Sequence, residues 1–578
     1  MFKLNYLKNK NSELFEDLGN EEFGDFKEVQ NYCPTYENFF QLSEQNWNNV
    51  NLNHKYSLCG MKEAITMNKY KISVRTLEND NTIEKESFFK YSPLMDPIKY
   101  MTGKYKKHEE NLLVSLPGYD KSPNKSLDKM NDRNNSAYVD AFFSFLSSRL
   151  LHDHTFIHGI DYYGCFLGVK KNYMYNVADE VDYLYESKYF FENNGKKFNV
   201  EKISESDYMS NESRNKKKKL DLSSDKIVEK DIITEIKIES INEELYDGLF
   251  KLTEENLEIH NAEKELEIVS INKDTKKSSS THSSCSSRSS NTNNEENDDE
   301  IESCSNSGKS NYSSSEGEDE LVYAEIHEFP VNMICLENMH QTLDSLMELE
   351  EDDDEDELTD KEWKSCFFQI IMILLAYQKS FKFTHNDLHT NNIMFNKTDK
   401  KVIYYKYNNS YFKVPTFGKI YKIIDFGRAI YSLNGVRYCS DSFHPKGDAA
   451  TQYNCEPYYN DQKPLIEPNM SFDLCRLACS LFDYFYEEIE DVKDDHNEIS
   501  LLVNEWCLDD KGRNILYKNN GDERYPEFKL YKMIARKVHK HTPEKQLEKL
   551  MFHCYKTSKK KMPKKAKIVN IDEIPEYF

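Results

Sequence analysis

The chain has 578 residues, of which 38% are hydrophobic, 13% aromatic and 31% charged, and its formal net charge is −25 at pH 7. This composition supplies a folded core together with solvated segments. The acidic balance argues against a surface built mainly to hold nucleic acid or an anionic membrane, since both would repel it. The 13 cysteines include no C-x-x-C pair, which excludes the usual zinc cluster and indicates a reducing, intracellular compartment.

No segment of the sequence predicts a membrane anchor. Met1–Lys10 alternates polar and apolar side chains and contains no continuous apolar core of signal-peptide length. The longest apolar run, Cys366–Tyr377, is too short to span a bilayer and is typical of a buried helix. We therefore expect a cytoplasmic protein with no membrane partner.

After an N-terminal extension, residues 1–45, the pattern predicts a strand hairpin, a helix and a further strand. Tyr70–Glu78 and Thr82–Tyr91 read as strands joined by the turn-forming tripeptide Asn79-Asp80-Asn81. Apolar residues recur at helical spacing from Ala137 to Leu151, and Ile160–Val169 then alternates like a strand. Together these elements form the first folded block, residues 46–195.

Two later segments have compositions that do not favour a packed core. Residues 196–320 contain the lysine run Lys216–Lys219, the serine-rich stretch Ser278–Ser290 and many Asp, Glu and Asn residues. Such a segment buries too little apolar surface to offset its ordering entropy, so we predict a disordered insertion. The unbroken carboxylate run Glu350–Glu357 is interpreted as a solvated loop rather than a metal site.

The second folded block begins after the insertion. Val331–Leu336 is a short apolar strand, and Trp363–Tyr377 is an apolar helix that leads into a histidine-rich motif. The aromatic segments Val402–Tyr411 and Val414–Ile420 predict an additional hairpin, and Phe472–Tyr486 predicts another helix. Residues 556–578 read as a basic tail.

Two motifs in this block carry the chemistry of phosphoryl transfer. His385–Asn392 reads H-N-D-L-H-T-N-N, and Asp425-Phe426-Gly427 follows the apolar pair Ile423-Ile424. A hydroxyl that attacks a γ-phosphate needs a carboxylate to accept its proton and a divalent metal to neutralise the phosphoryl oxygens. Asp387 supplies the base, while Asn392 and Asp425 supply hard oxygen ligands of the kind that magnesium prefers.

These motifs resemble those of the protein-kinase family, and the resemblance covers most of both folded blocks. It implies an α+β, two-lobed fold with a small β-rich N-lobe, a mainly helical C-lobe and the long disordered insertion in the N-lobe. By this likeness residues 46–195 and 321–340 form the N-lobe and hinge, and residues 341–555 form the C-lobe. The wording T-H-N-D-L-H-T-N-N-I-M-F and K-I-I-D-F-G-R-A-I is most similar to protein kinases encoded by giant DNA viruses, which would place the protein in the host cytoplasm or the virion.

The resemblance also implies roles for further residues, with ATP and Mg²⁺ as cofactors. In the C-terminal block Glu337 and Met339 belong to a hinge whose backbone meets adenine, and His385, Phe426, Gly427 and Asp473 are structural, with Asp473 bracing the catalytic loop. In the N-terminal block Lys90 is the candidate for the nucleotide-binding lysine, with Lys99 and Lys170 as alternatives. The expected helix partner is a Glu, but Asp140 is the only carboxylate within the predicted helix.

Some positions depart from the family pattern. Asn386 replaces the Arg that pairs with a phosphorylated activation segment, so activity should not depend on that switch. His389, grouped here with the catalytic residues, stands where serine/threonine kinases carry Lys. No G-x-G-x-x-G is present, and Gly60 stands alone before the hairpin.

Three functions remain open on the sequence. The first is a serine/threonine kinase that acts on an unidentified protein substrate. The second is a small-molecule phosphotransferase on the same fold. His389 favours it, and so does the lack of the A-P-E tripeptide that usually ends the activation segment in the family. The third is a pseudokinase scaffold, which the missing glycine loop favours and the intact Asp387, Asn392 and Asp425 disfavour.

Overall fold

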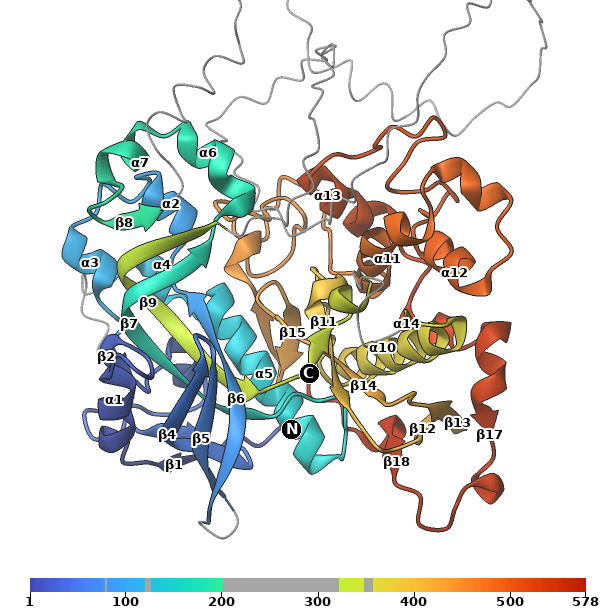
Figure 1. Ribbon diagram of the computed structural model, residues 1–578, viewed down its shortest axis with the longest axis horizontal. Coiled ribbons are helices and arrows are strands. Elements are labelled where there is room, and N and C mark those ends of the chain that lie inside the picture. Colours follow the sequence, from blue (N-terminus) through green and yellow to red (C-terminus); the bar gives the residue numbers. More distant parts are fainter. Residues whose placement is uncertain (78–80, 120–125, 201–321, 348–356) are drawn as a thin grey trace, which may run out of the picture. The chain divides into compact units, whose positions relative to one another are not determined.

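The computed structural model describes residues 1–77, 81–119, 126–200, 322–347 and 357–578. The turn Asn79-Asp80-Asn81, nearly all of the predicted insertion and most of the carboxylate run lie outside these residues, apart from Asn81 and Glu357. The described chain contains 12 α-helices and several antiparallel sheets, which confirms the mixed helix and strand content (Figure 1).

The largest sheet is antiparallel throughout and curls around its long central strands (Figure 1). Its strand order is β2-β7-β9-β6-β5-β4, and β8 pairs with the far end of β9. The strands are β2 (Phe26–Gln30), β4 (Tyr56–Thr66), β5 (Lys69–Thr76), β6 (Thr82–Pro93), β7 (Tyr162–Asn176), β8 (Phe198–Val200) and β9 (Tyr323–Glu337). The predicted hairpin is confirmed as β5 and β6. The strand predicted at Ile160–Val169 covers the first half of β7, and the strand predicted at Val331–Leu336 lies near the C-terminal end of β9.

Helix α5 (Ser136–Asp153) packs against this sheet, as the helical spacing from Ala137 predicts. The helix begins at Asn135, whose side chain accepts a hydrogen bond from the Ala137 N–H, a common N-cap arrangement. The buried amide of Asn332 on β9 donates to the Ala137 carbonyl over 2.8 Å. This contact ties the first turn of α5 to the centre of the sheet.

The first 45 residues are not a separate extension, and the sequence expectation is wrong here. Strand β2 pairs with β7 in the main sheet, and β1 (Tyr6–Lys8) pairs with β3 (Val50–Leu52). The insertion also starts later than expected, because β8 is paired up to Val200.

Short helices complete the part of the chain before residue 200. They are α1 (Ser12–Gly19), α2 (Pro97–Met101), α3 (Glu110–Val114), α4 (Asp128–Asn131), α6 (Val181–Tyr185) and α7 (Lys188–Asn193).

The remaining described chain contains five further helices. They are α10 (Asp360–Phe381), α11 (Phe472–Phe485), α12 (Glu498–Trp506), α13 (Phe528–Lys537) and the short α14 (Pro543–Gln546). Helix α10 starts at a capping box made by Thr359 and Glu362, and its apolar run is buried, as expected for Cys366–Tyr377. None of the described helices is long and apolar enough to cross a membrane.

Small sheets accompany these helices. They are β10 (Gln341–Thr342) with β11 (Ile393–Lys397) and β14 (Lys419–Ile423), β15 (Ile430–Leu433) with β16 (Val436–Cys439), and a sheet of order β17-β13-β12-β18. The last contains β12 (Val402–Tyr407), β13 (Ser410–Pro415), β17 (Lys556–Thr557) and β18 (Ile568–Asn570). The additional hairpin is thus confirmed as β12 and β13, although Val414–Ile420 divides between β13 and β14.

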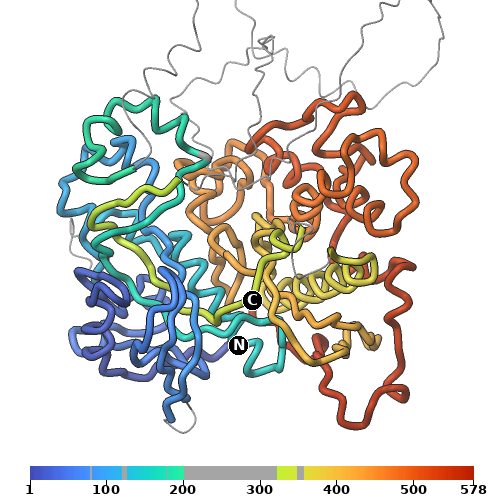
Figure 2. The backbone as a smooth tube through the Cα atoms, viewed as in Figure 1, coloured from blue at the N-terminus to red at the C-terminus, as the bar shows by residue number. Residues whose placement is uncertain are grey.

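The end of the chain is packed rather than a free basic tail. Strand β18 pairs in parallel with β12, and Ile571 and Ile574 are buried. The rings of Tyr577 and Phe2 lie 4.9 Å apart, so the two ends of the chain meet (Figure 2). Residues 556–578 therefore complete a sheet, and the lysines of the loop before β18 are among their exposed side chains.

Candidate functional site

The buried carboxylate of Asp473 holds the backbone of the loop that follows α10. Asp473, in the first turn of α11, accepts hydrogen bonds from the His385 N–H at 2.9 and 3.1 Å and from the Asn386 N–H at 2.9 Å. Burial raises the pKa of Asp473, while His385 and these backbone donors oppose that rise. The Asp473 carboxylate therefore fixes the backbone on which Asp387 stands, which is the position that the resemblance implies for it.

Replacing this brace is expected to destabilise the protein. Asp473→Asn replaces one carboxylate oxygen by an NH2 group, which cannot accept a hydrogen bond and faces a buried backbone N–H. We expect the free energy of unfolding to fall by about 1–3 kcal/mol, measured by urea unfolding. Asp483→Asn on the same helix is the matched control, since its amide oxygen can still accept from the Tyr517 hydroxyl. Equal losses in the two variants would contradict the bracing role.

Asn386 is a structural residue of this loop. Its φ of +66° lies in the left-handed region, which Asn tolerates better than most residues. Its side-chain amide donates to the Arg428 carbonyl at 2.9 Å and its oxygen accepts from the Tyr453 hydroxyl at 2.7 Å. The side chain thus joins the loop to the segment that follows Asp425 through neutral hydrogen bonds.

Asp387 lies in a positively charged and largely buried setting. Its Oδ1 accepts from the Tyr531 hydroxyl at 2.8 Å, and its Oδ2 lies 3.9 Å from Nε of Arg428. Burial by itself would raise the pKa of Asp387, but the charges of Arg428 and Arg476 and the Tyr531 hydrogen bond outweigh it and lower the pKa. The carboxylate is therefore ionised at neutral pH and can accept a proton.

The side chains of Asn392 and His389 make hydrogen bonds within the loop that carries Asp387. The Asn392 amide nitrogen donates to the Asp387 carbonyl at 2.9 Å and lies 3.0 Å from Nε2 of His389. Burial lowers the pKa of His389 to about 4, so the ring is neutral at pH 7 and Nε2 can accept this hydrogen bond. His389 therefore positions Asn392, whose side-chain oxygen is the atom that the sequence predicts as a metal ligand.

The ladder between β11 and β14 brings Asn392 and Asp425 to the same end of two strands. Ile393 pairs with Ile423, and the Ile424 N–H donates to the Asn392 carbonyl over 3.0 Å. Asn392 comes just before β11 and Asp425 just after β14. The two oxygen ligands that the sequence predicts are thus neighbours in space.

Lys90 connects Asp425 to α5. Its Nζ lies 2.6 Å from Oδ2 of Asp140 and 2.8 Å from Oδ1 of Asp425. Burial would lower the pKa of Lys90, but the two carboxylates outweigh it and raise the pKa. Burial by itself would raise the pKa of Asp425, but the charge and hydrogen bond of Lys90 outweigh it and lower the pKa to about 2. Burial raises the pKa of Asp140, against the lowering effects of Lys90 and of the Phe426 N–H. The three side chains join β6, α5 and the end of β14.

Phe426 and Gly427 fit tightly beside this cluster. The Phe426 N–H donates to Oδ1 of Asp140 at 3.0 Å, and its buried ring lies 4.6 Å from Phe143 of α5 and 5.8 Å from His385. His385 donates from Nε2 to the Ile424 carbonyl over 2.8 Å. A side chain on Gly427 would place Cβ 3.3 Å from Asp425 Oδ1. These residues hold Asp425 against α5 by packing.

The two residues expected at a hinge, Glu337 and Met339, lie at and just after the end of β9. The Glu337 side chain turns inward and accepts from Lys422 Nζ at 2.5 Å and from Asn396 at 2.8 Å. Its backbone N–H donates to the Asp161 carbonyl at 2.9 Å, and the Met339 side chain is buried. Any ligand contact at this end would therefore use remaining backbone groups rather than the Glu337 carboxylate.

The two alternative lysines make other contacts. Lys170 on β7 donates to the Gly24 carbonyl at 2.7 Å, and burial lowers the pKa of its ammonium to about 8. Lys99 lies 3.3 Å from Asp96 near the start of α2. Among these three candidates, Lys90 is the one in contact with Asp140 and Asp425.

Sequence reasoning missed several residues around the site. One missed element is strand β4, which precedes the expected hairpin and makes β6, with Lys90, the third strand of a meander. The Asn68 carbonyl, in the tight turn between β4 and β5, accepts a hydrogen bond from the Phe89 N–H. Arg428, Arg476 and Tyr531 were also missed. The charge of Arg428 beside Asp425-Phe426-Gly427 was a visible signal, whereas nothing local marks Tyr531.

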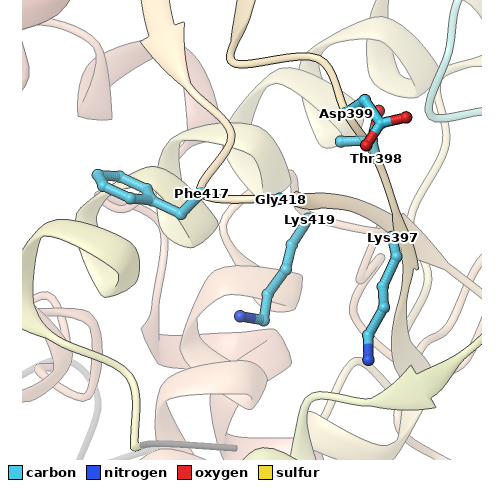
Figure 3. A pocket seen from close by; sticks show the side chains of 6 residues that line it. All are labelled: Lys397, Thr398, Asp399, Phe417, Gly418 and Lys419. Atoms are coloured by element: carbon cyan, nitrogen blue, oxygen red, sulfur yellow. The ribbon is translucent and has the colours of Figure 1, made fainter.

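A surface hollow of about 470 Å³ lies at the opposite end of the β11 and β14 ladder (Figure 3). It is lined by Lys397, Thr398, Asp399, Phe417, Gly418 and Lys419. Lys397 pairs with Lys419 in the ladder, whereas Ile393 pairs with Ile423 at the end that carries Asn392 and Asp425. The hollow is therefore separate from the candidate site.

The donor set fits magnesium better than a metal that needs a full protein cage. Among the described residues, no group of three or more His, Cys, Asp or Glu side chains is placed to hold a metal ion. Magnesium needs fewer protein ligands, because it keeps several waters and shares substrate phosphates. The Asn392 oxygen and the Asp425 carboxylate, brought together by the β-ladder, are oxygen donors of this kind.

Comparison with known proteins gives no independent assignment: no protein-family model matches the chain, and no curated protein matches it.

Proposed function

We propose that this protein is a serine/threonine protein kinase, which transfers the γ-phosphoryl group of ATP to protein hydroxyls with the help of magnesium. Under this proposal the main sheet with α5 is the N-lobe of a two-lobed kinase fold, and α10 to α14 belong to the C-lobe. The observation that carries the proposal is the ion-paired cluster of Lys90, Asp140 and Asp425. In protein kinases a lysine on the third strand pairs with a helix carboxylate while the D-F-G Asp holds magnesium.

Each residue then has a defined task. Asp387, whose pKa is held low, receives the proton of the acceptor hydroxyl. Lys90 contacts phosphate oxygens, and Asp140 keeps its ammonium in place. Asn392 and Asp425 hold magnesium, which when bound neutralises charge on the phosphoryl oxygens. Asp140 would take the role of the Glu that the family uses at this point.

The segment after Asp425 is braced without a phosphate group. Arg428 forms an ion pair of 2.7 Å with Asp448, and Asp441 accepts from the Ser136 N–H at the start of α5 over 2.9 Å. A carboxylate at a helix N-terminus is favourable for the same reason as a phosphate there. Together with the neutral bonds of Asn386, this arrangement supports activity that does not wait for phosphorylation of the segment.

Labelled ATP tests the proposal directly. The purified chain is incubated with magnesium and [γ-³²P]ATP, alone and with generic acceptor proteins, beside Asp425→Ala. We expect label on serine or threonine with the wild type and at least about a 100-fold lower rate with Asp425→Ala, because a magnesium ligand and the partner of Lys90 are both lost. Asp399→Ala, at the exposed hollow that is separate from the candidate site, should keep most of the rate. No transfer under any condition would contradict the proposal and leave the scaffold reading.

The small-molecule reading is separated by the acceptor. If the wild type transfers label to low-molecular-weight hydroxyl compounds while acceptor proteins stay unlabelled, the protein is a small-molecule phosphotransferase on the same residues. His389 is the sequence feature that favours this alternative, and its neutral ring supplies no fixed cation beside the phosphate.

A further inference from the structure

The hydroxyl of Tyr531 both donates and accepts a hydrogen bond beside the proposed base, Asp387. The Tyr531 hydroxyl donates to Oδ1 of Asp387 at 2.8 Å and accepts from Nε of Arg476 at 2.9 Å. A hydroxyl that is about to be phosphorylated needs the same two contacts, namely a carboxylate to take its proton and a donor to orient its oxygen. Asp387 and Arg476 therefore form a hydroxyl-binding site.

The site is deeply enclosed by cationic and aromatic groups. Arg476 is 2% exposed, and the guanidinium groups of Arg476 and Arg428 lie 5.1 and 5.7 Å from the centre of the Tyr531 ring. Phe528 stacks on the same ring at 5.5 Å. A buried Arg with its Nε directed at a hydroxyl oxygen is a costly arrangement, which a second role in acceptor binding would explain.

Helix α13, which carries Tyr531, begins at a residue with a strained backbone conformation. Glu527, immediately before the helix, has φ 52° and ψ −139°, a conformation that costs a non-glycine residue energy. The helix is joined to the segment after Asp425 through side-chain contacts to carbonyls, such as Arg536 to Thr451 at 2.5 Å and Asn469 to Ala535 at 3.3 Å. Displacement of the Tyr531 hydroxyl from Asp387 would require this helix to shift, and Glu527 is the strained residue at which it begins.

We propose that Asp387 and Arg476 together bind the acceptor hydroxyl, and that Tyr531 occupies this place until a protein acceptor displaces it. The inference rests on the proposed kinase function. In the transfer step the acceptor oxygen forms a bond to the γ-phosphorus, the bond from that phosphorus to the bridging oxygen of ADP breaks, and the hydroxyl proton passes to Asp387. Tyr531 then acts as a specificity residue, since water and small alcohols cannot supply the binding energy that moves α13.

Tyr531→Phe tests the occupant role, because it keeps the ring and removes the competing hydroxyl. We expect kcat/KM for a generic acceptor protein to rise about tenfold, as expected for loss of one hydrogen bond to a charged group, while KM for ATP stays within about twofold. Tyr525→Phe is the matched control, because its hydroxyl accepts from Lys537 Nζ of the same helix at 2.7 Å. Phosphate found on Tyr531 of the wild type would also support the assignment, since it places that hydroxyl at the reacting position.

Arg476→Lys in the Tyr531→Phe background tests the donor. We expect acceptor kcat/KM to fall about tenfold with KM for ATP unchanged, because a lysine does not reproduce the directed Nε–H. If Tyr531→Phe instead lowers the rate and moves the acid limb of the pH profile, Tyr531 positions Asp387 and the inference is wrong although the kinase proposal stands. If neither wild type nor variants transfer phosphate, the kinase proposal fails and the inference falls with it.

Discussion

Asp387→Asn is expected to reduce kcat for phosphoryl transfer by about 10²–10⁴-fold. It removes the proposed proton acceptor and puts a side chain of the same size and shape in its place. The amide oxygen can still accept from the Tyr531 hydroxyl, so the fold around the loop should be kept. The measurement is kcat with saturating ATP and acceptor protein, at a temperature where both proteins are folded by circular dichroism.

Asp448→Asn separates loss of the base from loss of a partner for Arg428. Arg428 lies 2.7 Å from Asp448 and 3.9 Å from Asp387, so the control disturbs the same cation more strongly. A loss in Asp448→Asn as large as that in Asp387→Asn would assign the effect to Arg428. Because the pKa of Asp387 is held below its usual value, the base is already ionised at pH 6, and its titration should not limit the wild-type rate between pH 6 and 8.

Lys90→Ala is expected to lower kcat/KM for ATP by about 10²–10³-fold, since it removes the cation that Asp140 and Asp425 hold in place. Lys170→Ala, the matched control on β7, should change this value by less than about threefold. Lys170 is bound to the Gly24 carbonyl and lies over the Tyr91 ring at 4.6 Å, so its loss affects packing.

Lys90→Arg distinguishes catalysis from stability. Alanine leaves Asp140 buried without its cation, which also lowers the free energy of unfolding. Arginine keeps the positive charge and should recover much of the unfolding free energy, but its larger planar head should not recover activity. Equal losses of activity in Lys90→Ala and Lys170→Ala would remove Lys90 from the nucleotide site.

The local elements around the site could be predicted because each rests on a short, continuous pattern. The apolar periodicity of Ala137–Leu151 and Trp363–Tyr377 predicted α5 and α10, and alternation predicted β6 and β7. The bounds were less accurate, as in β9, which is far longer than Val331–Leu336. Its continuation pairs with the end of β7 and with β8, and such pairings between distant segments have no local signal.

The N-terminal residues are a second case in which pairing with a distant segment could not be predicted from local sequence. Residues 1–45 appeared separable because they contain no long periodic element. In the structure β2 adds to the edge of the main sheet through β7, and the Phe2 N–H donates to Asn434 at 2.8 Å. Short strands gain their stability from such partners rather than from their own sequence, so their existence is decided by tertiary contacts.

The sequence by itself determined which chemical groups this protein can bring to a reaction. Asp387, Asn392 and Asp425 were identified because their motifs are contiguous, and the ladder of β11 and β14 follows from strands near them in the chain. Only the tertiary structure decided that Lys90 meets Asp140 and that Tyr531 meets Asp387, pairs that are 50 and 144 residues apart. The physical reason is that charge pairing and hydroxyl binding depend on distances of about 3 Å in space, which residue spacing along the chain does not encode.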